Sequence, residues 1–120
     1  MKACDFVGML FLARDVTHSV HLNTRNYSKH KALQKFYENI IKTADAFAEA
    51  YQGRNGLIGS ISLSSAKKTT NVVEFLQSQL EDIEANRYKI CDKNDSTMQQ
   101  LIDNIIELYL STLYRLRFLA

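Results

Sequence analysis

The sequence predicts an all-α protein, folded as an antiparallel four-helix bundle. Proline is absent and only four of the 120 residues are glycine, whereas the turns of small β-sandwiches and barrels depend on both residues. Four segments carry apolar residues at intervals of three and four, the spacing of one face of an α-helix. Because 46% of the chain is apolar, it can bury one core. We therefore expect a single domain over residues 1–120.

The first two segments are expected to form helices over residues 5–22 and 29–52. The polar segment 22–28 separates them, and Ser28 could cap the second helix. Gly53 is a typical C-terminal stop for that helix. The apolar stripes consist of Phe6, Leu10, Ala13, Val16 and Val20 in the first helix, and of Leu33, Phe36, Ile40, Ala44, Phe47 and Tyr51 in the second.

Two further helices are expected over residues 71–91 and 96–118. Each begins with the spacing of a capping box, Asn71 with Glu74 and Ser96 with Gln99. Their stripes consist of Val73, Leu76, Leu80, Ile83 and Ile90, and of Met98, Leu101, Ile102, Ile105, Ile106, Tyr109, Leu113 and Leu116.

The connection between the second and third helices is longer than the others. Residues 54–70 show no helical period, but the piece 57–63 is apolar, which predicts a packed connection rather than a free linker. This piece either packs on the core or covers a dimer interface. A bundle with only short loops would not need such a length, whereas a ferritin-type bundle requires a crossover at this point.

One group of residues could carry chemistry. His18, His21 and His30 surround the first turn, and Asp45 and Glu49 follow one helical turn apart on the second helix. Imidazole and carboxylate groups together can bind iron, with manganese or zinc as alternatives. However, His30 and Asp45 are separated by about 22 Å of helical rise. A metal shared by both sets would therefore need two chains related by a twofold axis.

The second helix also indicates self-association. Tyr37, Ile41 and Ala48 lie beside its main stripe, which makes the apolar surface wider than its neighbours within one chain require. We therefore expect a homo-oligomer, at least a dimer.

The spacing of the four principal candidates, His18, His30, Asp45 and Glu49, resembles that of the mini-ferritin (Dps) family. Small phage ferritin-like proteins are more similar still, over residues 9–56 and less closely over 98–119. Their shared motifs read here His18-x-x-His21, Asn26-Tyr27-Ser28-Lys29-His30, His30-Lys31-Ala32-Leu33, Asp45-x-x-x-Glu49-Ala50-Tyr51-Gln52-Gly53, and Thr112 to Leu119.

The resemblance implies a ferritin-like bundle, encoded by a phage, with iron between two subunits. His18 and His30 of one chain and Asp45 and Glu49 of the other would hold Fe(II), which peroxide or oxygen would oxidise in a ferroxidase-type reaction. His21 is either a third ligand or a histidine of the turn. The alternative is a non-catalytic phage bundle that serves as a virion component or as a binder or inhibitor of a host factor.

Other partners are disfavoured. The net charge of +2 is too balanced for a protein that binds nucleic acid by bulk charge, and we expect the basic pairs Lys67–Lys68 and Arg115 with Arg117 to be solvated. No apolar run is long enough to span a membrane, and the N-terminus makes a poor signal peptide. Cys4 and Cys91 lack motif spacing and fit a reducing compartment. We expect the protein in the cytoplasm of a host cell, or in a virion.

Overall fold

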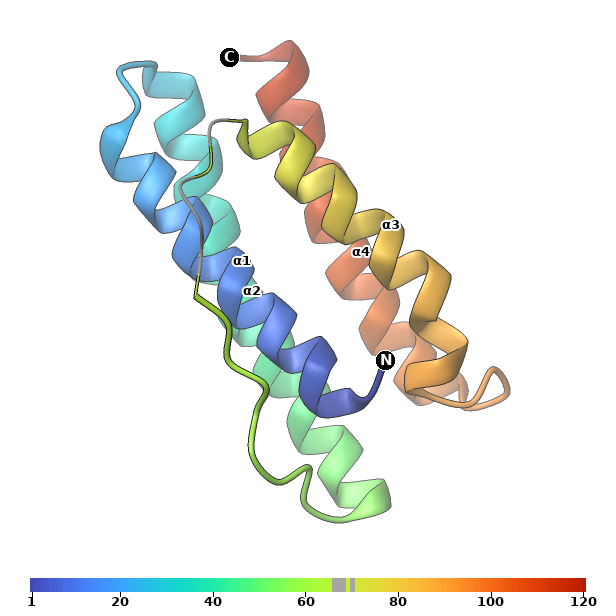
Figure 1. Ribbon diagram of the computed structural model, residues 1–120. Coiled ribbons are helices and arrows are strands. Elements are labelled where there is room, and N and C mark those ends of the chain that lie inside the picture. The colour runs from blue at the N-terminus through green and yellow to red at the C-terminus, as the bar shows by residue number, and fades with distance from the viewer. Residues whose placement is uncertain (66–68, 70) are drawn as a thin grey trace.

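The computed structural model describes residues 1–65, 69 and 71–120, and in this part of the chain all regular structure is helical. The four helices are α1 (Ala3–Asn23), α2 (Tyr27–Asn55), α3 (Val72–Ile90) and α4 (Ser96–Phe118), as Figure 1 shows. The prediction of an all-α four-helix fold is confirmed. Lys67 and Lys68 lie outside the described residues.

The helices form a bundle in which every neighbouring pair is antiparallel. α1 and α4 lie diagonally opposite, and each of them contacts both α2 and α3. Residues 56–65 of the connection after α2 run back along α1, and α3 starts at the end of the bundle where α2 starts (Figure 1). The predicted crossover between the second and third helices is therefore present, and α2 and α3 run in the same direction.

The helix ends differ from the predicted ones by a few residues. α2 begins with Asn26 as its cap, whose side chain accepts a hydrogen bond from the Lys29 amide, rather than with Ser28. It continues through Gly53 to Asn55 and stops at Gly56, which has a φ of 87° that other residues rarely adopt. Asp95, and not Ser96, caps α4. Both observed caps carry a side-chain acceptor: Asn26 lies three residues before the predicted start at residue 29, and Asp95 lies one residue before the predicted start at residue 96.

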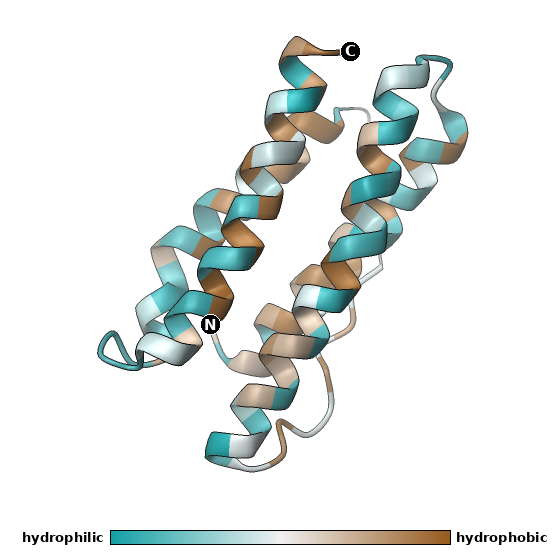
Figure 2. Ribbon diagram, turned by 180° about the vertical axis from the view of Figure 1, so that it is seen from behind, coloured by the Kyte–Doolittle hydropathy of each residue, from teal (hydrophilic) through white to brown (hydrophobic). Residues whose placement is uncertain are grey.

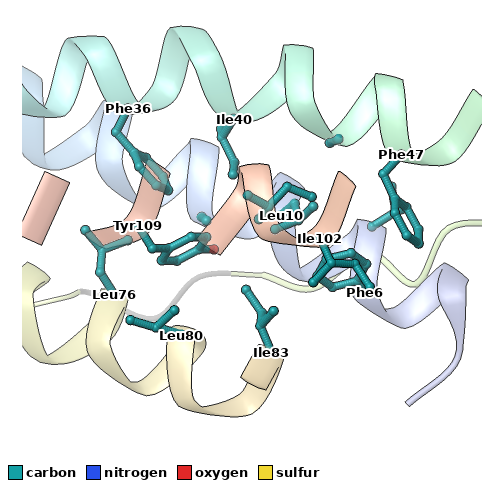
Figure 3. Close-up of a cluster of buried hydrophobic side chains, with 14 of the residues drawn as sticks. Phe6, Leu10, Phe36, Ile40, Phe47, Leu76, Leu80, Ile83, Ile102 and Tyr109 are labelled. Atoms are coloured by element: carbon teal, nitrogen blue, oxygen red, sulfur yellow. The ribbon is translucent and has the colours of Figure 1, made fainter. Parts of the chain in front are cut away.

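The core consists of one apolar stripe from each helix, and large aromatic rings fill its centre (Figure 3). Phe6 of α1 meets Phe47 of α2 edge-on, with ring centroids 4.9 Å apart. Phe36 meets Tyr109 of α4 in the same way at 5.1 Å. The Tyr109 hydroxyl donates a hydrogen bond of 2.6 Å to the side chain of Gln79 on α3, so its only polar atom is satisfied in the core.

The crossover is held against α1 at a glycine. A Cβ atom at Gly8 would lie 2.0 Å from the carbonyl oxygen of Ser62, so only glycine allows this approach. The Ser62 amide donates to the Cys4 carbonyl, and its hydroxyl donates to the Asp5 carboxylate at 2.7 Å. Within the connection, isoleucines 58 and 61 pack against the core. Leucines 57 and 63 are exposed, so the prediction of a packed segment holds only in part.

In the described part of the chain, none of the helices is both long and apolar enough to cross a membrane.

Candidate metal site at the turn between α1 and α2

The structure brings the three histidines together, because α1 and α2 are antiparallel and joined by a short turn. His18 and His21 lie in the last turns of α1, and His30 lies in the first turn of α2. The rings of His21 and His30 stack with their centroids 3.6 Å apart, and the His18 ring lies 6.1 Å from that of His21.

His21 and His30 tie the two helices together by reciprocal hydrogen bonds. Nδ1 of His21 donates to the His30 carbonyl at 2.7 Å, and Nδ1 of His30 donates to the His21 carbonyl at 2.9 Å. A carbonyl only accepts, so each Nδ1 must carry the proton. In the neutral rings the lone pair is then on Nε2, which is the usual arrangement of a histidine that binds a metal through Nε2.

The ring of Tyr37 packs against two of the three histidines. Tyr37 of α2 stacks on His18 with centroids 4.2 Å apart, and it meets His21 edge-on at 5.2 Å. The sequence assigned Tyr37 to an apolar surface wider than contacts within one chain require, but its ring packs against histidines of the same chain. Ile41 and Ala48, assigned to the same face, pack against the chain's own core. The width of this stripe therefore does not by itself require a second copy.

Asp45 and Glu49 lie on the exposed side of α2, far from the histidines along the same continuous helix. Their separation from His30 is the rise of about 22 Å worked out above. Among residues 1–65, 69 and 71–120, no hydrogen bond or ion pair engages either carboxylate, and no group of three or more His, Cys, Asp or Glu side chains could hold a metal ion. Within one chain the histidine pair and the carboxylate pair stay apart, so a metal bound by both would have to lie between two chains.

Comparison with known proteins places the chain in a family. Residues 21–116 match the model of a family of unknown function, DUF5856. The chain belongs to this family. It is also similar to the uncharacterized 14.6 kDa protein in the mobD-ri intergenic region of Enterobacteria phage T4, with 27% identity over 116 residues, which covers 96% of this chain and 88% of the relative. No solved structure matches.

The region that this DUF5856 protein shares with the family model contains four of the five candidate ligands. His21, His30, Asp45 and Glu49 lie inside it, and His18 lies three residues before it. The matched region also includes the whole of α2 and α3 and nearly all of α4.

Two surface features of this DUF5856 protein escaped the sequence analysis. Leu110, Tyr114 and Phe118 are more than half exposed at four-residue intervals, and so form an apolar stripe on the outside of α4. The helical spacing of these three residues can be seen in the sequence, but the core residues of α4 have the same kind of spacing. Periodicity alone does not show which of the two sets faces the core. Arg115 is not simply solvated as expected: its Nη1 atom is buried and has no hydrogen-bond partner in the described part of the chain.

Proposed function

We propose that this DUF5856 protein is a phage-encoded, ferritin-like bundle that binds a transition-metal ion, iron first, between two copies of the chain. The observation that carries the proposal is the hydrogen bond from His30 Nδ1 to the His21 carbonyl, which fixes the ring and presents Nε2 as the ligand atom. An exposed carboxylate pair without partners complements it elsewhere on α2.

The proposed site takes ligands from both chains. His18 and His30 of one chain supply neutral nitrogen donors, and Asp45 and Glu49 of the other supply negatively charged oxygen donors. This mixed set suits iron, with zinc or manganese as alternatives. His21, which is buried and bonded through Nδ1, orients His30 and is the possible third histidine ligand. When Fe(II) is bound, the chemistry available is its oxidation by peroxide or oxygen, a ferroxidase-type reaction.

Two further facts support the proposal without deciding it. The single crossover between α2 and α3 is the connection found in ferritin-like bundles, although a shared fold is only an analogy for function. A phage relative matches nearly the whole chain, which agrees with a phage origin.

Sedimentation velocity with Fe(II) under anaerobic conditions, or with Zn(II), tests the proposal. A metal that binds only the dimer stabilises it by about 2.7 kcal/mol per site at a hundredfold excess over its dissociation constant. Since imidazole binds metal only when neutral, the effect should weaken between pH 7.5 and 5.5. The proposal fails if dimer strength ignores metal at both pH values.

Matched variants assign the effect to these residues. Asp45→Asn and Glu49→Ala should remove the metal-dependent gain and leave the circular dichroism unchanged, because both side chains are exposed. Glu84→Gln changes an exposed carboxylate on α3 and should leave the gain intact. An equal loss in Glu84→Gln would mean that the metal binds surface carboxylates non-specifically.

The second candidate function is a non-catalytic phage bundle, either a virion component or a binder or inhibitor of a host factor. The exposed stripe Leu110, Tyr114 and Phe118 on α4 favours it, because neighbouring exposed apolar side chains mark protein contacts. Purified virions probed with an antibody against the chain test the virion form. Presence of wild-type protein and absence of a folded Phe118→Ser variant would support that form, and absence of both would reject it.

A further inference from the structure

The solvent-facing side of α2 carries a pattern of charges that is complementary to itself. Six charged side chains lie on this side, and all of them are exposed. Their spacing alternates between four and three residues, which keeps them on one side of a helix over its middle turns. Figure 2, which views the bundle from the side of α2 and α4, shows hydrophilic segments recurring along α2. The six residues are Lys31, Lys35, Glu38, Lys42, Asp45 and Glu49, referred to below as the α2 charged face.

Each of these charges has a charge of opposite sign at the same distance on the other side of residue 40. If a second α2 is laid antiparallel across this face so that the helices cross at the level of residue 40, each charge meets an opposite one. Lys31 then faces Glu49 of the other copy, Lys35 faces Asp45, and Glu38 faces Lys42. A twofold axis repeats each pairing, so all six charges of both copies are matched in one register.

Within one chain the two ends of the α2 charged face are left unbalanced. Lys31 and Lys35 are like charges one turn apart, and so are Asp45 and Glu49, an arrangement that disfavours an isolated helix. The ion pairs formed among the described residues join Arg14 with Asp15, Arg54 with Asp95 and Arg87 with Asp103, and none involves this face.

A cavity beside the basic end supplies an independent observation. It measures about 340 Å³, and its lining includes the three cationic side chains Lys31, Lys35 and Arg115 together with Gln34 and Glu38. Arg115 is the residue whose Nη1 is buried without a hydrogen-bond partner in the part of the chain that the structure describes. A buried guanidinium nitrogen requires an acceptor. Three cations and the single carboxylate of Glu38 line the cavity, so its excess positive charge favours a further carboxylate. In the antiparallel register the acidic end of a second α2 reaches this cavity.

We propose that the α2 charged face is the interface with a second copy of the chain, packed antiparallel about a twofold axis at the level of residue 40 along the helix. The partner's acidic end then lies over the cavity and offers carboxylates to Arg115. This interface does not need a metal. It goes beyond the proposed metal site, although the same register brings His30 close to the partner's Glu49.

The test uses Glu38 and Lys42, because neither belongs to the proposed metal site. Sedimentation velocity of the full chain is carried out in EDTA at low salt. Wild type should be dimeric or larger, whereas Glu38→Lys and Lys42→Glu should each dimerise about tenfold more weakly or worse, since each reversal sets like charges against each other at two places. An equimolar mixture of the two variants should associate again, because every contact between unlike copies is then complementary. The double variant should associate as well.

Controls separate this interface from a general charge effect. Glu84→Lys and Lys89→Glu make the same changes on exposed positions of α3 and should leave association unchanged. Wild-type association should also weaken at 1 M salt, where the screening length falls to about 3 Å.

Three outcomes would overturn the proposed interface. The wild type could stay monomeric at low salt, its association could be unchanged in both charge-reversal variants, or the mixture of the two variants could fail to associate. Since no metal is present, such a failure leaves the metal titration as a separate question. Conversely, an interface that forms in EDTA while metal has no effect would reject only the metal site.

Discussion

Replacing Gly8 by alanine tests whether the crossover really lies against α1 in the way the structure describes. Gly8 is inside a helix, where alanine normally stabilises by about 0.5–1 kcal/mol because it restricts the unfolded chain. At this position, however, the new methyl group would lie 2.0 Å from the Ser62 carbonyl oxygen and 2.8 Å from its carbon. The neighbour is backbone and not the end of a flexible side chain, so the crossover itself has to move.

The expected magnitude follows from these contacts. Forcing an extra carbon into a filled space costs about 1–3 kcal/mol. Moving Ser62 also strains its hydrogen bonds to Asp5 and Cys4, which adds to this cost. After the gain in helix propensity is subtracted, the free energy of unfolding should fall by about 1–3 kcal/mol. For a chain of this length that corresponds to about 4–12 °C in the midpoint of thermal unfolding.

Gly53 provides a matched control, because it also lies in a helix but nothing is within 4 Å of a Cβ built there. Gly53→Ala should raise the midpoint by about 2–4 °C. Thiol labelling gives a local readout: in Gly8→Ala, Cys4 should react faster because the crossover no longer covers it, while the buried Cys91 stays slow. If both alanine variants shift the midpoint upwards by similar amounts, the close approach of Ser62 to α1 is refuted.

Three further outcomes are expected. Tyr109→Phe leaves the buried side-chain oxygen of Gln79 without its donor and should lower the free energy of unfolding by about 1–3 kcal/mol in urea titrations; adding Gln79→Met should cost less than the two single changes summed. Burial raises the pKa of the Cys91 thiol from 9.0 to about 11. The stability that the buried neutral thiol contributes is therefore fully present below about pH 9 and is lost as the pH rises through 11. A Cys91→Ala variant should lack this part of the pH dependence of the free energy of unfolding. The hydrogen bond from the Ser62 hydroxyl lowers the pKa of Asp5 below 3.8. The stability that the ionised Asp5 contributes is therefore present above that pH and is lost as the pH falls below it. The free energy of unfolding of Ser62→Ala should depend less on acid pH than that of the wild type.

The order of the residues was enough to predict the fold class, the four helices and the position of the crossover. Apolar spacing is a local property, and a helix that must bury one face displays that spacing whatever it packs against. The crossover followed from length, because the segment between the second and third helices is longer than a short turn needs. The complementary spacing of the charges along α2 can also be seen in the sequence, once the helix is known to expose the side that carries them.

Which residues contact one another depends on how the four helices pack in three dimensions. The bonding of His21 with His30 depends on how α1 and α2 are aligned, and the approach of Ser62 to Gly8 depends on the path of a segment without helical period. The buried Nη1 of Arg115 could not be foreseen, because its position in α4 reads equally well as surface. Periodicity specifies a face for each helix, but the rotation and offset between helices are set by side-chain packing among residues far apart in the chain.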